Sequence, residues 1–378
     1  MANHEPFRIE IPQDAITDLH ERLDRTRFPQ QIDGVGWDLG TELEALQHLC
    51  DHWRHQFDWR AQEERLNAWP QFVATIDGEN LHYAHIRSDE PDATPLVITH
   101  GWPGSISEFL DVVGPLTDPQ AHDGRAEDAF HLVLPSIPGF GFSGPTVSRG
   151  NDPARIAGMI AELMAELGYE RYIAQGGDWG AIITTEMGRI DAEHLAGIHV
   201  NMPTALPPKD QEPTERERDA LAAMAYYRDV DSGYAQIQGT KPQTIGYALN
   251  DSPAGLAAWI LEKFRQWSDC DGDVFRSYTE DQLLTNISLY WFTQTAASSA
   301  RIYYERRHST PPDTRVDVPT GVARFPTEIF RPSRRWCEAA YNITRWTEFG
   351  RGGHFAAMEV PHLLVGDIRA FAAQVREP

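Results

Sequence analysis

Four short apolar runs, each ending at glycine or proline, constrain the fold of this chain more than any other feature. Amphipathic helical patterns separate them, and the clearest covers residues 152–168, with Asp152 as N-cap, Pro153 in the first turn and Gly168 as the stop. Strands that alternate with helices indicate a mostly parallel sheet covered by helices on both faces. The runs are PLVITHGWPG (95–104), HLVLPSIPGFGFSGP (131–145), RYIAQGGDWG (171–180) and HLAGIHVNMP (194–203).

The same patterns divide the chain into three parts. Residues 1–92 are rich in tryptophan and histidine, and we expect a mainly helical N-terminal extension there. From Phe72 the pattern changes and predicts two strands around the turn signal Asp77-Gly78. Residues 206–310 are helical, aromatic-rich and poor in strand patterns, which predicts a helical lid over the carboxyl edge of the sheet. The sheet itself is expected from residues 93–205 and 311–378, the second of which closes with a helix.

Charge and cysteine content narrow the class of protein. The 33 Lys and Arg residues against 56 Asp and Glu residues give a formal charge of −23, which repels nucleic-acid phosphates and anionic lipid. Cys50, Cys270 and Cys337 are far apart without a CxxC motif, which favours a reducing compartment. With neither a bilayer-length apolar run nor a signal-peptide pattern, we expect a cytoplasmic protein without nucleic-acid or membrane partners. A homodimer is compatible with the sequence, which does not indicate an oligomeric state.

The most specific local motif is Gly176-Gly177-Asp178-Trp179-Gly180, between a predicted strand and a predicted helix. It matches the nucleophile turn of α/β-hydrolases, with aspartate where most members have serine. In that fold the loop His100-Gly101-Trp102-Pro103-Gly104 would supply one oxyanion-hole N–H, from Trp102, and Trp179 the other. His354 lies in a glycine-rich loop after the last predicted strand, which is where α/β-hydrolases carry their catalytic base. By itself the pentapeptide fits a helix capped by aspartate equally well.

The aspartate determines the class of reaction that the motif predicts. Attack by serine on an sp³ carbon would give an ether, which water cannot turn over. Attack by aspartate gives an ester, which water cleaves at the carbonyl carbon. Asp178 therefore indicates a strained or activated sp³ electrophile, either an epoxide or an alkyl halide.

Beyond these motifs the chain resembles the epoxide hydrolases of the microsomal and juvenile-hormone type, which carry an N-terminal domain ahead of the α/β-hydrolase fold. The resemblance implies a soluble, bacterial member that converts a lipophilic epoxide and water to a vicinal diol through an aspartyl ester, without metal or cofactor. Mammalian microsomal members begin with a membrane anchor, whereas this chain starts at the globular part, so we do not expect their membrane location. The similar segments are FDWRAQEERLNAWPQF, HGWPGSISEF, PSIPGFGFS, QGGDWG, GTKPQTIGYALNDSPAGLAAWILEKF, LLTNISLYW, VPTGVARFPTEI and RGGHFAAMEVP.

Matched residue by residue, the resemblance implies that Asp178 is the nucleophile and His354 the base. Glu328, in FPTEI, would orient the histidine and stabilise its charge. Asp317, in VDVP, is the second candidate for this acid. Without the resemblance, Glu328 would equally fit a solvated surface carboxylate.

Two tyrosines complete the site that the resemblance implies. Tyr234 in SGY and Tyr303 in RIYYE match the pair whose hydroxyls bind the epoxide oxygen, and the adjacent Tyr304 leaves the register of the second one open. Phenols have a pKa of about 10, so both stay protonated at neutral pH and can donate to the alkoxide as the ring opens.

Two other functions fit part of the pattern. A haloalkane dehalogenase would use the same aspartate and histidine, with the Trp179 indole holding the halide, but it needs neither the tyrosine pair nor this N-terminal domain. A catalytically silent α/β-hydrolase receptor would usually have lost a catalytic residue, and here none is missing. The lid tryptophans Trp259, Trp267 and Trp291 fit a bulky lipophilic substrate or a packed core equally well.

Overall fold

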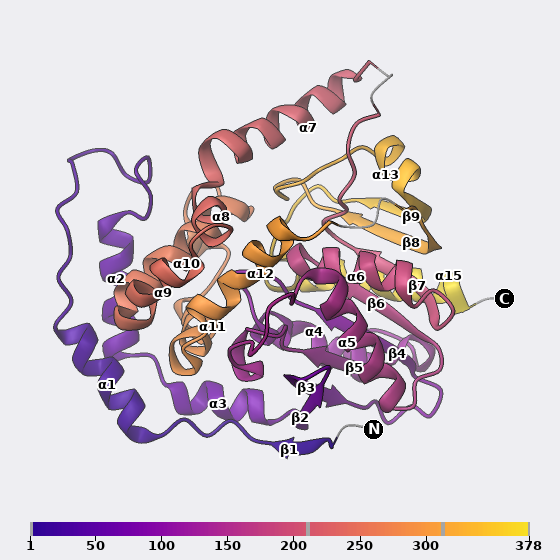
Figure 1. Ribbon diagram of the computed structural model, residues 1–378, viewed down its shortest axis with the longest axis horizontal. Helices are drawn as coiled ribbons and strands as arrows, with labels where there is room; N and C mark the ends of the chain where they lie inside the picture. Colours follow the sequence, from indigo (N-terminus) through magenta and orange to yellow (C-terminus); the bar gives the residue numbers. More distant parts are fainter. Residues whose placement is uncertain (1–2, 209–211, 311–313, 377–378) are drawn as a thin grey trace.

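The computed structural model describes residues 3–208, 212–310 and 314–376, and a nine-stranded sheet runs through these residues (Figure 1). The strand order is β1-β2-β3-β5-β4-β6-β7-β8-β9; neighbours from β5 to β9 are parallel and the remaining pairs antiparallel. This confirms the predicted α/β-hydrolase class with a mostly parallel sheet. The strands are β1 (Glu5–Phe7), β2 (Gln71–Ile76), β3 (Glu79–Ile86), β4 (Thr94–Thr99), β5 (Phe130–Pro135), β6 (Tyr172–Gly176), β7 (Leu195–Val200), β8 (Val316–Arg324) and β9 (Tyr341–Glu348).

The four apolar runs of the sequence became the central strands β4, β5, β6 and β7. Every residue of β5, β6 and β7 is buried, as expected for strands covered on both faces. Adjacent residues of β7 show the two layers: Gly197 faces Phe371 of α15 (Pro361–Arg376), and Ile198 faces Gly188 of α6 (Asp178–Ile190). Because successive residues of a strand point to opposite faces, these two helices cover opposite sides of the sheet.

The helix pattern over residues 152–168 is confirmed in detail. Helix α5 spans Pro153–Glu166, and the Asp152 side chain accepts a hydrogen bond from the Arg155 N–H. Gly168 follows the helix at φ +84°, a left-handed conformation that glycine adopts without strain. The other helices are α1 (Gln13–Asp24), α2 (Leu43–His55), α3 (Trp59–Asn67), α4 (Leu110–Thr117), α7 (Glu215–Tyr226), α8 (Gly233–Gln238), α9 (Pro242–Asp251), α10 (Pro253–Trp267), α11 (Glu280–Thr293), α12 (Ala296–His308), α13 (Arg334–Ala340) and α14 (Ala356–Glu359), with short turns at η1 (Ile106–Phe109), η2 (Pro119–His122), η3 (Ala126–Asp128), η4 (Gly141–Ser143), η5 (Tyr227–Asp231) and η6 (Val274–Arg276).

The N-terminal part joins the sheet through the two strands predicted around Asp77-Gly78 and through a third, β1, that was not predicted. After α1, α2 and α3 the chain enters β2 and β3, and the short strand β1 pairs with β2 through Glu5 and Val73. These three strands continue the hydrolase sheet without a break. Helix α2 instead supports the helices between β7 and β8, because the Trp53 indole donates a hydrogen bond to Ser288 of α11 at 3.0 Å.

Helices α8 to α12 gather beside the carboxyl ends of the parallel strands, next to the helices of the N-terminal part (Figure 1). They follow β7 and precede β8, and α9 packs against both α10 and α12. Residues 311–313, where we predicted that the chain re-enters the sheet, lie outside the described residues. Among the described residues, every helix is too short or too polar to cross a membrane.

Candidate functional site

Asp178 lies at the turn between β6 and α6, where the backbone requires glycine neighbours. Its own φ is +49°, an unusual value for a residue with a side chain. A Cβ on Gly180 would lie 1.9 Å from the Thr99 carbonyl oxygen, and one on Gly176 would lie 2.2 Å from that of Gly180. Gly176 therefore lets the turn close on itself and Gly180 lets it pack against β4, and the turn holds Asp178 at the carboxyl edge of the sheet.

The loop after β4 supplies a main-chain donor to this carboxylate. The N–H of Trp102 donates to Asp178 Oδ1 at 2.7 Å. Gly101 makes the approach possible, because a Cβ there would lie 2.3 Å from the aspartate side chain. The structure brings Trp179 to the site through its indole, whose ring centroid lies 4.7 Å from that of Tyr303 in an edge-to-face contact.

His354 lies between two carboxylates in the interior of the molecule. Its Nε2 lies 3.4 Å from Asp178 Oδ2, and its Nδ1 lies 2.6 Å from Glu328 Oε1. The histidine and glutamate side chains are 2% and 1% exposed. Asp317, the second candidate for the acid, is 83% exposed and lies near Arg315, so the structure brings Glu328 to the histidine instead.

The two carboxylates control the charge of the histidine. Burial lowers the pKa of His354, but the negative charge of Glu328 and hydrogen bonds to Asp178 and Glu328 outweigh it and raise the pKa well above the usual value. The two carboxylates therefore favour the imidazolium form, with Asp178 on one side of the ring and Glu328 on the other.

Tyr234 of α8 and Tyr303 of α12 meet at the site. Their hydroxyl oxygens are 3.5 Å apart, and both side chains are buried. The Trp102 ring stacks on Tyr234, with centroids 4.8 Å apart and planes at 10°. Burial, and then neighbouring groups including Asp178, raise the pKa of both phenols well above 10. Both are therefore protonated hydrogen-bond donors near the carboxylate.

The structure also separates Tyr303 from its neighbour. Tyr304 turns away from the tyrosine pair and stacks on His308, one helical turn later, with ring centroids 4.1 Å apart. Of the three tryptophans named in the predicted lid, one contacts the site and the other two have partners elsewhere. Trp267 contacts the His354 ring at 5.0 Å, whereas Trp259 bonds to Gln238 and Trp291 lies under the Arg22 guanidinium.

Two residues at the site were not predicted from the sequence. The hydroxyl of Tyr227 lies 2.9 Å from that of Tyr234 and extends the tyrosine pair. Glu108 lies in the segment HGWPGSISEF and lines a small cavity together with Asp178 and His354. The resemblance covers this segment as a whole, but nothing in its spacing distinguishes Glu108 from an ordinary helix residue.

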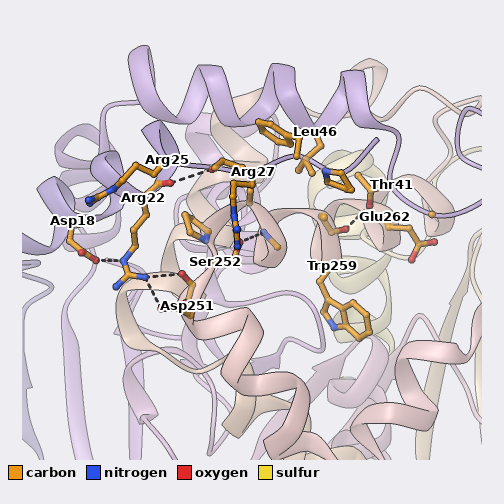
Figure 2. A pocket seen from close by; sticks show the side chains of 18 residues that line it. Asp18, Arg22, Arg25, Arg27, Thr41, Leu46, Asp251, Ser252, Trp259 and Glu262 are labelled. Atoms are coloured by element: carbon orange, nitrogen blue, oxygen red, sulfur yellow. Dashed lines mark hydrogen bonds and ion pairs between the residues drawn. The ribbon is translucent and has the colours of Figure 1, made fainter. Parts of the chain in front are cut away.

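The cavity at Asp178 measures about 20 Å³ and is lined by the nucleophile turn, the loop after β4 and the segment that begins at His354. A much larger cavity of about 860 Å³ lies elsewhere, between α1 and the start of α10, and contains none of the site residues (Figure 2). In it the Arg22 guanidinium donates to Asp251 at 2.8 Å. Within the described residues, no group of three or more His, Cys, Asp and Glu side chains is arranged to hold a metal ion.

Comparison with known proteins agrees with the fold and with the site. Residues 94–244 match the alpha/beta hydrolase fold family, which together with the nucleophile turn defines the class as an α/β-hydrolase. Residues 4–109 match the family described as "Epoxide hydrolase N terminus". The chain is 48% identical to a protein of Stigmatella aurantiaca (strain DW4/3-1) named "Putative epoxide hydrolase", over 98% of this chain and 85% of the relative. It is 37% identical to epoxide hydrolase 1 of Oryctolagus cuniculus, over 98% of this chain and 89% of the relative.

A solved structure shows the same architecture. The juvenile hormone epoxide hydrolase of the silkworm Bombyx mori superposes with a TM-score of 0.92 at 31% identity, covering 100% of this chain and 96% of that one. The chain therefore belongs to the epoxide hydrolase family, whose members are hydrolases acting on ether bonds. The resemblance seen in the sequence motifs is confirmed.

Proposed function

We propose that this protein converts a lipophilic epoxide and water to a vicinal diol through an ester formed on Asp178. The observation that supports this most directly is the arrangement around the Asp178 carboxylate. It contacts the Trp102 N–H and His354, and its charge acts on the paired phenols of Tyr234 and Tyr303. The aromatic rings around the carboxylate suit an apolar substrate.

In the first half-reaction an Asp178 oxygen attacks one epoxide carbon, and the bond between that carbon and the ring oxygen breaks. The departing oxygen becomes an alkoxide that needs a proton. Tyr234 and Tyr303 are positioned to donate hydrogen bonds to it, because both hydroxyls are protonated and lie 3.5 Å apart.

Ester formation then changes the role of His354. Because the ester is neutral, one of the two negative groups that raise the pKa of His354 is lost, and the imidazolium gives up its proton more easily. That proton replaces the one that a tyrosine hydroxyl passes to the alkoxide, which leaves a neutral hydroxyl on the substrate and a neutral imidazole. The neutral imidazole can take a proton from water, whose oxygen attacks Cγ of the ester. Glu328 stabilises the imidazolium that forms, and the Trp102 N–H stabilises the developing oxyanion. The ester bond breaks and the diol leaves.

The proposal also assigns roles to the parts of the chain. Residues 206–310 act as the lid, because α8 and α12 bring one tyrosine each to the site. Residues 1–92 form the N-terminal domain that holds the lid, as the contact of Trp53 with α11 suggests. The core then comprises residues 93–205 and 311–378. We further propose a cytoplasmic location, which the three free, buried cysteines support.

A single turnover in heavy-oxygen water tests the ester mechanism. With enzyme in excess over styrene oxide, we expect an unlabelled diol, because its new oxygen comes from Asp178 and the label enters the carboxylate. Label in the diol after that first turnover would show direct attack by water and overturn the proposal. A chloroalkane should release no chloride, whereas a dehalogenase would release it.

A further inference from the structure

A carboxyl group that the mechanism above does not use lines the cavity at the nucleophile. Glu108 belongs to η1, in the loop that follows β4, and it shares the cavity with Asp178 and His354. Glu108 lies inside the protein, but its side chain is only partly buried. This is expected for a side chain that faces a cavity.

The size and lining of this cavity suit one water molecule. Its volume of about 20 Å³ is close to that of a single water-sized probe. A buried water needs two to four polar partners, roughly the number that the lining offers. Asp178, His354 and Glu108 provide an ester carbon to attack, a base and a hydrogen-bond acceptor around this one space.

The loop holds the Glu108 carboxyl in a defined place. A Cβ on Gly104 would lie 1.5 Å from Glu108 Oε1, so the carboxyl rests against the main chain where only glycine leaves room. The main-chain N–H groups of Ser105 and Gly101 also favour its ionised form. Gly101 packs against Asp178 in the same manner, and one loop therefore positions both carboxyl groups.

The charge state of Glu108 follows from its neighbours. Burial raises the pKa of Glu108 to about 8, with His354 lowering it and Asp178 raising it further. The group is therefore mostly a neutral acid at pH 7, and its carbonyl oxygen is a hydrogen-bond acceptor. A buried carboxyl kept without an ion pair costs stability, which is typical of functional positions.

We propose that Glu108 positions the hydrolytic water, by accepting a hydrogen bond from one O–H while the other points to His354 Nε2. The inference rests on the proposed function, because the water attacks the Asp178 ester. In that step the water oxygen bonds to Cγ and one water proton passes to His354. The bond between Cγ and the substrate oxygen breaks, and that oxygen leaves as the diol hydroxyl with the proton from His354.

Separate measurement of the two half-reactions tests this role. In quenched-flow mass spectrometry with styrene oxide, Glu108→Leu should slow ester hydrolysis by about 10–100-fold and leave ester formation within about threefold. Since kcat/KM reports ester formation, kcat and KM should fall together and kcat/KM should stay constant. Glu108→Gln keeps a carbonyl acceptor and should retain hydrolysis within about fivefold. If the Glu108→Leu variant does not fold, Glu108→Ala is used in its place.

Glu359→Gln is the matched control. Glu359 is another buried carboxyl, with its pKa raised to about 7 by burial, but it accepts hydrogen bonds from the Asp269 and Phe355 main chain and does not line the cavity. We expect it to leave the ratio of the two half-reactions unchanged. The inference is overturned if Glu359→Gln slows hydrolysis as selectively as Glu108→Leu does, if Glu108→Leu slows both steps equally, or if Glu108→Gln is as slow as Glu108→Leu. If the wild-type enzyme turns over without any ester, the proposed function fails instead.

Discussion

Nδ1 of His354 lies 2.6 Å from Oε1 of Glu328, and both side chains are almost fully buried. The same glutamate oxygen accepts the main-chain N–H of Ile329 at 2.7 Å, which holds the carboxylate in place. A buried carboxylate so close to the imidazole favours the imidazolium form, the state that His354 would reach in the proposed mechanism when it takes a proton from water. The pair therefore suits the second half-reaction of that proposal more than the first.

Glu328→Gln should slow ester hydrolysis by about 10²–10³-fold, because the imidazolium loses its charge partner while the shape of the site is kept. Ester formation should change much less. The decay of the adduct in single-turnover mass spectrometry measures the effect. Asp317→Asn is the control, since Asp317 is 83% exposed, and it should leave both steps unchanged. If Asp317→Asn slows ester hydrolysis, Asp317 and not Glu328 is the acid that supports His354.

His354→Gln should still open the epoxide but stall at the ester, because only hydrolysis needs a base. Intact-protein mass spectrometry should then show the mass of protein plus substrate. Asp178→Asn, which lacks the nucleophilic carboxylate, should show no adduct. A folded His354→Gln variant that neither turns over nor accumulates an adduct would contradict this division of labour.

Tyr234→Phe and Tyr303→Phe should each slow ester formation by about 10²–10³-fold, because one donor to the developing alkoxide is lost. Ester hydrolysis should be nearly unaffected, and the double variant close to inactive. Rapid-quench measurement of adduct formation separates the two steps. Tyr304→Phe serves as the control, because Tyr304 stacks on His308 and should be neutral. A neutral Tyr303→Phe with an impaired Tyr304→Phe would reverse the assignment.

Gly180→Ala should displace the nucleophile turn, because the new methyl group would lie 1.9 Å from the Thr99 carbonyl oxygen, a main-chain atom that cannot move aside. We expect destabilisation by about 1–3 kcal/mol and a strong loss of activity. Gly158→Ala is the matched control in α5, where a Cβ meets nothing within 4 Å. It should stabilise the helix by up to about 1 kcal/mol. Urea unfolding of both variants measures their free energies of unfolding, which should change in opposite directions relative to the wild type.

Acid should weaken the contribution of Asp367 to stability. Burial raises the pKa of this carboxyl, but His199, Thr347 and Arg345 outweigh burial and lower the pKa from 3.8 to about 2. Since the pKa is lower in the folded state, the stabilisation is present above about pH 4 and is lost as the pH falls toward 2. It amounts to about 2 kcal/mol. The difference in unfolding free energy between wild type and Asp367→Asn should therefore shrink between pH 5 and about pH 2.5, and a constant difference would contradict the shift.

Much of the fold was predictable because its rules act over a few residues. The strand runs, the cap and stop of α5 and the glycine spacing around Asp178 follow from steric and hydrogen-bonding limits between close neighbours in the chain. The strand β1 was not predicted, because its three residues have no pattern of their own and form a strand only beside β2.

The relations between distant residues were decided by the tertiary structure. In α12 neighbouring side chains point about 100° apart, so the sequence permits either Tyr303 or Tyr304 to face the site. The packing of α12 against α8 and α9 turns Tyr303 inward. Likewise, spacing along the chain does not determine whether Glu328 or Asp317 reaches His354, or that Glu108 lines the same cavity as the nucleophile. Distances between such residues depend on how whole helices and strands pack, and that packing minimises the free energy of the entire chain rather than of any one segment.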